Sequence, residues 1–333
     1  MARIFPVVFA VAALTATAEP APLGLVLSGG GAKGAYEVGV WQELEEAGLA
    51  STIVAVSGTS VGAINAALFA TRPEAAESLW LENMEDVFTL NTNRVGESIQ
   101  KTVDDASRAV AVAEETGEDR KGVASFLLAS LVRLAGDYAE MVASDAPREG
   151  YVDSAKLAAV LTNALPAEWP AGAPGVYATA FKKGDEGETS TWKLNEETHE
   201  RRILMLRASA AIPVGFDTVE IDGKTYVDGG WESKGGDNVP LEPILEHHPE
   251  IKTVVIVYLD DEKHYNKKRF DKNHAAAVAA GVTPVEIVPS ENIGRGFDGW
   301  LGVFDASPET AKHLIELGRQ DTRKKLREAG FAE

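Results

Sequence analysis

Residues 23–70 read LGLVLSGGGAKGAYEVGVWQELEEAGLASTIVAVSGTSVGAINAALFA, and their pattern is the strongest indication of the fold class. An apolar run over residues 23–28 leads into three consecutive glycines, and residues 34–47 then follow a helical pattern. The same order returns at residues 52–57, where a second apolar run meets a glycine-flanked turn and a helix of small residues over 63–70. Two successive units of strand, tight turn and helix predict an α/β fold whose parallel sheet is covered on both faces.

Three later apolar runs extend the predicted sheet, at residues 175–181, 253–259 and 284–288. Residues 308–327 have the pattern of a closing helix. The polar, helix-rich region at about 73–165 is expected to form an insertion or cap. No repeat and no linker rich in proline or glycine divides residues 19–333, so we expect a single domain.

Composition excludes several classes of partner and of site. The 333 residues are 45% hydrophobic, which is enough for a large core. Lysine and arginine total 32 against 51 acidic residues, and the net charge of -19 would repel nucleic acids and anionic membranes. A lipid substrate must then be reached through a local apolar or basic patch. The absence of cysteine excludes disulfides, thiolate metal sites and a cysteine nucleophile.

Gly58-Thr59-Ser60-Val61-Gly62 matches the pattern GxSxG and lies between a predicted strand and a predicted helix. A serine on such a sharp turn exposes its hydroxyl at the edge of the sheet, because the flanking glycines let the backbone bend and the helix pack closely. The helix N-terminus also favours negative charge that develops nearby. Ser60 is therefore the candidate nucleophile, and Gly58 and Gly62 shape its turn. A chance match is the alternative, since the chain holds 31 glycines.

The glycine-rich turn at residues 29–34, GGGAKG, also satisfies the dinucleotide-binding pattern GxGxxG. That interpretation requires an acidic residue at the end of the next strand, which instead ends Val56-Ser57-Gly58. A nucleotide-hydrolase phosphate loop fails as well, because Lys33 is followed by glycine. Backbone amides of Gly29, Gly30, Gly31 and Gly34 can instead bind the oxyanion of an acyl-transfer intermediate. A purely structural turn is the alternative.

A serine nucleophile needs a proton acceptor, which is most often histidine. All six histidines lie in polar or charged surroundings: His199, His247, His248, His264, His274 and His313. A better candidate is Asp228, where a short strand runs directly into Gly229-Gly230. Asp-Gly is often an ordinary turn, as expected for Asp222-Gly223 in a hairpin just upstream. Asp228 differs because the glycine pair permits a close approach to another backbone.

These motifs, together with Ala208-Ser209-Ala210-Ala211-Ile212-Pro213 and Asn238-Val239-Pro240, occur in an order that resembles the patatin-like phospholipase family. The resemblance runs from about residue 23 to about 240 and leaves out residues 86–150. It implies an α/β fold related to cytosolic phospholipase A2, with a parallel-rich central sheet and helices on both faces. It also implies a dyad of Ser60 and Asp228, the turn Gly229-Gly230 beside it, and a glycine-rich oxyanion loop.

The resemblance further implies hydrolysis of lipid or other acyl esters without a metal or a cofactor, and transient contact with a membrane surface. Two alternatives stay open: a soluble esterase or thioesterase for short acyl chains, and a lipid-binding relative without catalysis. Trp231 lies next to the proposed site and is expected to contact the acyl chain. Oligomeric state and head-group preference do not follow from these residues.

The first 18 residues differ in kind from the rest of the chain. Arg3 precedes an apolar run over residues 4–14, and Ala16-Thr17-Ala18 follows. This pattern is typical of a signal peptide cleaved after Ala18, and the run is too short for a membrane-spanning helix. A core strand or helix at the N-terminus is the alternative.

We therefore expect an exported protein, periplasmic or secreted, whose mature N-terminus is Glu19. N-terminal sequencing of protein purified from its native cell tests this expectation. An intact Met1 in a cytoplasmic fraction would instead show that the segment is retained.

Overall fold

A computed structural model describes residues 21–88, 93, 149–184, 188–213, 215–231, 235–260, 267–294 and 303–331. These residues contain one eight-stranded sheet whose main path has the order β5-β6-β3-β2-β1-β7-β8, with β4 paired to β3. The strands are β1 Leu23–Leu27, β2 Ile53–Thr59, β3 Gly175–Lys182, β4 Thr189–Lys193, β5 Val219–Ile221, β6 Lys224–Asp228, β7 Thr253–Val257 and β8 Thr283–Ile287. Five of them, β3-β2-β1-β7-β8, run parallel, while β4, β5 and β6 add antiparallel pairs.

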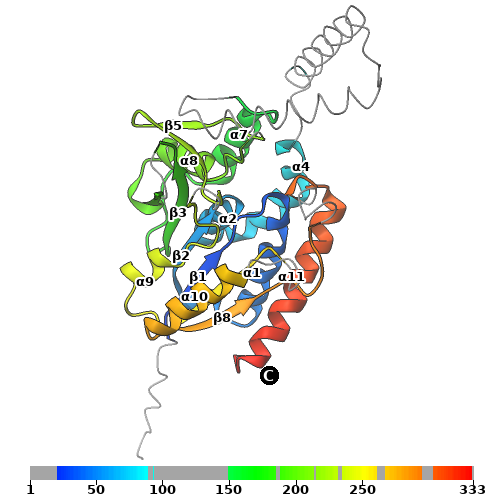
Figure 1. Cartoon of the computed structure of the whole chain (residues 1–333). Helices are drawn as coiled ribbons and strands as arrows, with labels where there is room; N and C mark the ends of the chain where they lie inside the picture. The colour runs from blue at the N-terminus through cyan, green and yellow to red at the C-terminus, as the bar shows by residue number, and fades with distance from the viewer. Residues whose placement is uncertain are drawn as a thin grey trace, which may run out of the picture.

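Helices cover both faces of the sheet (Figure 1). The described α-helices are α1 Ala35–Glu46, α2 Val61–Thr71, α3 Ala76–Glu82, α4 Met84–Val87, α7 Ser154–Ala164, α8 His199–Ser209, α9 Glu242–His247, α10 Lys267–Ala279 and α11 Pro308–Glu328. Short 3-10 turns occur at η1 Gly31–Gly34, η2 Ala50–Thr52, η3 Pro73–Ala75 and η4 Leu194–Glu196. None of the described helices is long and apolar enough to cross a membrane.

The central strands are apolar on both sides because both faces are packed. Along β1, Leu25 and Leu27 join the larger core beneath α1 and α2. Val26 points the other way, into a second core with Ile244 of α9 and Ala277 of α10. The sheet is thus the middle layer of three, as the apolar runs predict.

The predicted α/β class and the main elements are confirmed, with boundaries shifted by one to a few residues. The hairpin around Asp222-Gly223 joins β5 to β6, and Asp222 adopts a φ of 51°. The sequence pattern did not reveal β4, whose residues are mostly half-buried or exposed. Within the region expected to be a cap, residues 89–92 and 94–148 lie outside the described residues.

Helix α11 packs lengthwise on α1, near the C-terminal end of the chain (Figure 1). Their backbones touch at two glycines: a Cβ on Gly39 would lie 1.9 Å from the Ile315 carbonyl oxygen, and a Cβ on Gly318 would lie 2.1 Å from that of Tyr36. The Tyr36 hydroxyl also donates to Asp321 Oδ2 at 3.0 Å. The glycines therefore set how closely α11 covers the helix that follows the glycine-rich turn.

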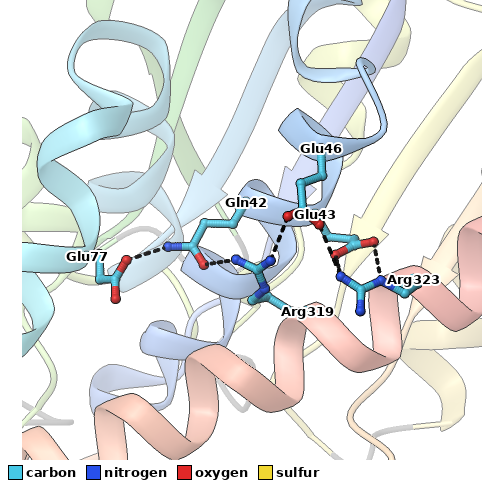
Figure 2. Close-up of polar contacts among 6 residues, drawn as sticks. All are labelled: Gln42, Glu43, Glu46, Glu77, Arg319 and Arg323. Carbon is cyan, nitrogen blue, oxygen red and sulfur yellow. Dashed lines mark hydrogen bonds and ion pairs between the residues drawn. The ribbon is translucent and has the colours of Figure 1, made fainter.

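Charged side chains flank this crossing (Figure 2). Arg323 donates to both carboxylate oxygens of Glu43, at 2.8 and 2.7 Å. Arg319 reaches Glu46 at 2.9 Å and Gln42 at 3.2 Å. Partly exposed ion pairs of this kind typically contribute only about 0 to 1 kcal/mol each to the free energy of unfolding. We therefore infer that they fix the register of the two helices, and that apolar packing supplies most of the stability.

Gly318→Ala tests the close crossing. In an exposed helix this change stabilises by about 1 kcal/mol, because glycine is a poor helix former. Here the added methyl meets the Tyr36 carbonyl, so we expect the opposite sign, a loss of roughly 1 to 3 kcal/mol in the free energy of unfolding. Denaturant unfolding measures it. Lys324→Ala, at an exposed position of α11, is the control and should change little; a stabilised Gly318→Ala variant would contradict the crossing.

Candidate active site

Ser60 occupies a sharp turn between the end of β2 and the start of α2. Its φ of 56° and ψ of -127° lie in a region that non-glycine residues rarely adopt, and such strain costs about 1 to 3 kcal/mol. Both flanking positions require glycine, because a Cβ at either one would clash with neighbouring backbone atoms. A Cβ on Gly58 would lie 2.3 Å from the backbone of Gly62, and one on Gly62 would lie 2.5 Å from the Leu27 carbonyl oxygen. Ser60 therefore lies on the sharp strand-to-helix turn that the GxSxG pattern predicts.

Asp228 ends β6 as a buried carboxyl group with one satisfied oxygen. Its Oδ1 accepts a hydrogen bond from the Gly230 amide at 2.7 Å. Its Oδ2 is buried and accepts no hydrogen bond of ordinary geometry from any described residue. Burial raises the pKa of Asp228 to about 6, although interactions with the Ser60 hydroxyl and the Gly230 amide act to lower it. A carboxyl group with that pKa is ionised at neutral pH yet takes up a proton more readily than an exposed aspartate.

The strands that carry these two residues share one edge of β3. β2 pairs with the first part of β3 and β6 pairs with its last three residues, while β4 occupies the opposite edge along both parts. Because β2 runs parallel and β6 antiparallel to β3, their carboxyl ends meet. Thr59 lies opposite Thr179, and Asp228 lies opposite the next residue, Ala180. Ser60 follows Thr59 and thus comes beside Asp228.

The glycine pair after Asp228 makes this meeting sterically feasible. A Cβ on Gly229 would lie 2.4 Å from the Thr179 carbonyl oxygen and 3.0 Å from the Thr59 side chain. A Cβ on Gly230 would lie 2.4 Å from Asn238 Oδ1. Side chains larger than hydrogen would therefore push the turn away from β2 and β3.

The glycine-rich loop does not act as the uniform row of donors that the sequence predicts. The Gly29 amide donates to the Asn238 carbonyl at 3.0 Å, while Asn238 Nδ2 donates to the Gly29 carbonyl at 3.1 Å. This reciprocal pairing removes Gly29 from the set of free donors. Gly34 packs against Val61 and Trp80, where a Cβ would lie 2.4 and 2.8 Å away, so its role is close packing of helices.

Gly30 and Gly31 remain as candidate oxyanion donors. Among the described residues, neither amide has an acceptor. Gly31 has a φ of 58°, and a Cβ there would lie 2.4 Å from the Val303 carbonyl oxygen. The amides at the start of α2 also lack intrahelical acceptors, because the first turn of any helix does. Donors from two strand-to-helix turns thus flank Ser60.

A buried polar network lies under this loop. Asn65 Nδ2 donates to Glu37 Oε2 at 2.8 Å and to the Gly34 carbonyl at 2.9 Å, and Trp80 Nε1 donates to Asn65 Oδ1 at 3.0 Å. Burial raises the pKa of Glu37 well above its usual range. Sequence inspection did not identify these residues, because a glutamate and an asparagine within helices carry no local signal of burial.

An apolar pocket opens beside the serine. Its lining is almost entirely apolar: Gly31, Ser60, Val61, Ile64, Met84, Val87, Phe88, Leu157, Ala210, Ile212 and Phe216. The Phe88 ring packs edge-on against Phe216 and Phe304, with ring centroids 5.9 and 6.0 Å apart. The side chains around Ser60 are therefore predominantly apolar.

Trp231 is not among the residues that line that pocket, and its expected contact with the acyl chain stays a prediction. Its ring packs edge-on against Phe181 at a centroid distance of 5.9 Å. Together with Val227 these two residues form a separate small apolar cluster. Trp231 follows the glycine pair after Asp228, and its ring belongs to this cluster rather than to the pocket lining.

The described histidines interact elsewhere in the fold. His199 bonds the Pro166 carbonyl, His274 pairs with the largely buried Glu286, and His313 pairs with the exposed Glu291. His247 stacks on Tyr177, and His248 bonds the Tyr177 hydroxyl and Glu250. His264 lies outside the described residues. None of the five described histidines forms a hydrogen bond with Ser60 or Asp228.

Comparison with known proteins gives a family match. A family model described as patatin-like phospholipase matches residues 25–245. Lysophospholipase nte1 of Aspergillus terreus is 56% identical over 48 residues, which are 14% of this chain and 3% of that protein. An uncharacterized NTE family protein of Mycobacterium bovis is 49% identical over 57 residues, 17% of this chain and 9% of its own. The matched segments are thus a small part of these longer relatives.

Two solved structures are similar more weakly over most of the chain. VipD from Legionella pneumophila is 16% identical, with a TM-score of 0.45 over 93% of this chain and 67% of that chain. Human GIVD cytosolic phospholipase A2 is 10% identical, with a TM-score of 0.42 over 92% of this chain and 60% of that chain.

Asp228→Asn should stabilise the folded protein at neutral pH. The pKa of Asp228 is about 6 in the folded chain against an ordinary 3.8, so the folded state binds the proton more tightly. The tighter proton binding stabilises the folded state fully at a pH below 3.8, and this stabilisation is lost as the pH rises through about 6. By linkage the loss is on the order of 3 kcal/mol by pH 8. Asparagine at this position does not lose stability in this way, because its amide group does not ionise.

The measurement is the free energy of unfolding of Asp228→Asn minus that of the wild type, at pH 4 and at pH 8. The difference should grow with pH. Asp222→Asn is the control in the same hairpin, and it should show the opposite trend, because Arg201 lowers the pKa of Asp222. A pH-independent difference at Asp228 would contradict the raised pKa.

Proposed function

Because the chain belongs to the patatin-like phospholipase family, we propose that it hydrolyses acyl esters of lipids, with Ser60 as nucleophile and Asp228 as general base. The observation that carries the proposal is the meeting of β2 and β6 on one edge of β3, which brings Ser60 beside a buried carboxyl group. The free Oδ2 of Asp228 supplies the proton acceptor. No other titratable side chain among the described residues interacts with Ser60 in this way.

In the first half of the reaction the Ser60 hydroxyl attacks the ester carbonyl carbon, and its proton moves to Asp228. The negative charge that forms on the carbonyl oxygen is stabilised by the amides of Gly30 and Gly31, and each such donor contributes about 3 to 4 kcal/mol. The intermediate then collapses, the bond to the alcohol breaks, and Asp228 returns the proton to the departing oxygen. The product is an acyl ester of Ser60.

In the second half a water molecule attacks this acyl ester. Asp228 accepts a proton from the water, the same amides stabilise the new oxyanion, and the fatty acid leaves as Ser60 recovers its proton. Burial of Asp228 assists both halves, because a dry site raises the proton affinity of the carboxylate and strengthens the electrostatic interactions.

The apolar pocket defines the substrate class within this proposal. Met84, Phe88 and Phe216 would contact the acyl chain, while the ester carbonyl lies at Ser60. The net charge of -19 disfavours approach to strongly anionic surfaces. We therefore favour a lipid acyl hydrolase that makes transient contact with membranes, and we propose export after cleavage near Ala18 as its route to them. A short-chain esterase is the alternative, and a series of aryl esters of increasing chain length distinguishes the two.

The dyad predicts a specific pattern of losses in kcat/KM on one aryl ester. Ser60→Ala should leave a folded protein without activity, and Asp228→Asn should lose activity by about a thousandfold or more, because an amide cannot accept the proton. A fluorophosphonate should label the wild type once, at Ser60. Changing each histidine singly to glutamine should leave kcat/KM close to that of the wild type.

Asp222→Asn serves as the matched control, since it makes the same chemical change at an exposed position of the hairpin that ends in Asp228. A folded histidine variant with a thousandfold loss would replace the dyad by a triad. Ester turnover by pure Ser60→Ala above background would remove Ser60 from its role.

A further inference from the structure

Ser209 is the last residue of α8 and is fully buried. Its hydroxyl oxygen accepts a hydrogen bond from the Ser60 amide at 2.8 Å and donates its own proton to the Thr179 carbonyl at 2.6 Å. Thr179 is the β3 residue that lies opposite the last residue of β2. One hydroxyl group thus joins the backbone of the nucleophile to the strand on which the site is assembled.

The backbone at this end of α8 holds the other half of the site. The Gly229 amide donates to the Ser209 carbonyl at 3.3 Å, and the Asp228 amide donates to the Ala211 carbonyl at 3.0 Å. The last carbonyls of a helix have no acceptor role within the helix itself. Here the carbonyl of Ser209, the last residue of α8, and that of Ala211, two residues beyond the helix, accept from the turn that carries Asp228, so one short segment contacts both members of the dyad.

The Ser60 amide needs such a partner. It precedes the first turn of α2, where no intrahelical acceptor exists, and the residue is buried, so water does not replace one. Its backbone is also held at a φ of 56°, which only surrounding contacts can maintain. A change in this hydrogen bond would rotate the turn and therefore redirect the hydroxyl oxygen of Ser60 relative to Asp228.

We propose that Ser209 is a positioning residue, whose hydroxyl group fixes the direction of the Ser60 nucleophile relative to Asp228. The proposal rests on the proposed function, because it assumes attack by Ser60. The role requires a small group that donates and accepts at once, and a hydroxyl meets this requirement whereas a methyl group does not. Ser209 does not itself touch the substrate.

The test compares Ser209→Ala and Ser209→Thr with the wild type, on one aryl ester and with a fluorophosphonate. Ser209→Ala should lower kcat and the rate constant of Ser60 phosphonylation by about 10- to 100-fold, since a small misplacement of a reacting atom has this effect. KM and the binding constant of the fluorophosphonate should change little. Ser209→Thr keeps the hydroxyl group and should restore most of the rate.

Ser154→Ala is the matched control. Ser154 is also a buried serine, and its hydroxyl oxygen accepts a hydrogen bond from the Asp217 amide at 2.9 Å. Ser154 has no hydrogen bond to Ser60. Both alanine variants should have a lower melting temperature than the wild type. The Ser154→Ala variant, however, should keep kcat near the wild-type value. A Ser209→Ala variant with wild-type kcat, or equal losses of kcat in both alanine variants, would overturn the proposal.

Two further results separate the remaining cases. If the wild type neither hydrolyses the ester nor reacts at Ser60, the proposed function fails, and this failure is distinct from that of the positioning role. If Ser209→Ala does not fold, amide hydrogen exchange in the wild type decides: the Ser60 amide should be strongly protected, whereas exchange at the rate of an unstructured peptide would contradict a hydrogen bond to Ser209.

Discussion

The site depends on one constraint, the sharing of a single edge of β3 by two strands that run toward each other. β4 occupies the other edge, so β2 and β6 meet end to end. Hydrogen-bonding register sets their separation, because Thr59 and Asp228 pair with consecutive residues of β3. The sheet therefore places Ser60 beside the Asp228 carboxyl group with the precision of a backbone ladder, which a pair of loops would not provide.

Several features that lower stability gather at this junction. Ser60 holds a strained backbone, Asp228 is buried with one oxygen lacking a hydrogen bond, and the amides of Gly30 and Gly31 lack acceptors among the described residues. Each is unfavourable in a resting fold and would be useful in the acyl transfer that we propose. The rest of the scaffold, above all the large apolar core, must offset them.

Segments remote in sequence complete the site by hydrogen bonds to its backbone. Asn238 pairs reciprocally with Gly29, and the end of α8 binds the turns of Ser60 and Asp228. The resemblance to patatin-like proteins included both segments, yet gave no role for either side chain. Ser209 looks like an ordinary residue at the end of a helix until the fold brings it against Ser60, which is why no local pattern could reveal its function.

Local patterns in the sequence predict the α/β class, the turn at Ser60 and the glycines that flank it, because these follow from periodicity and from steric limits within a few residues. They also indicate Asp228 through the glycine pair that follows. The folded structure was needed to show that the Gly29 amide is paired, that Trp231 packs against Phe181, and that Asp228 comes beside Ser60. Those outcomes depend on strand order and register, which arise from pairing between distant segments and therefore leave no trace in the sequence near any one residue.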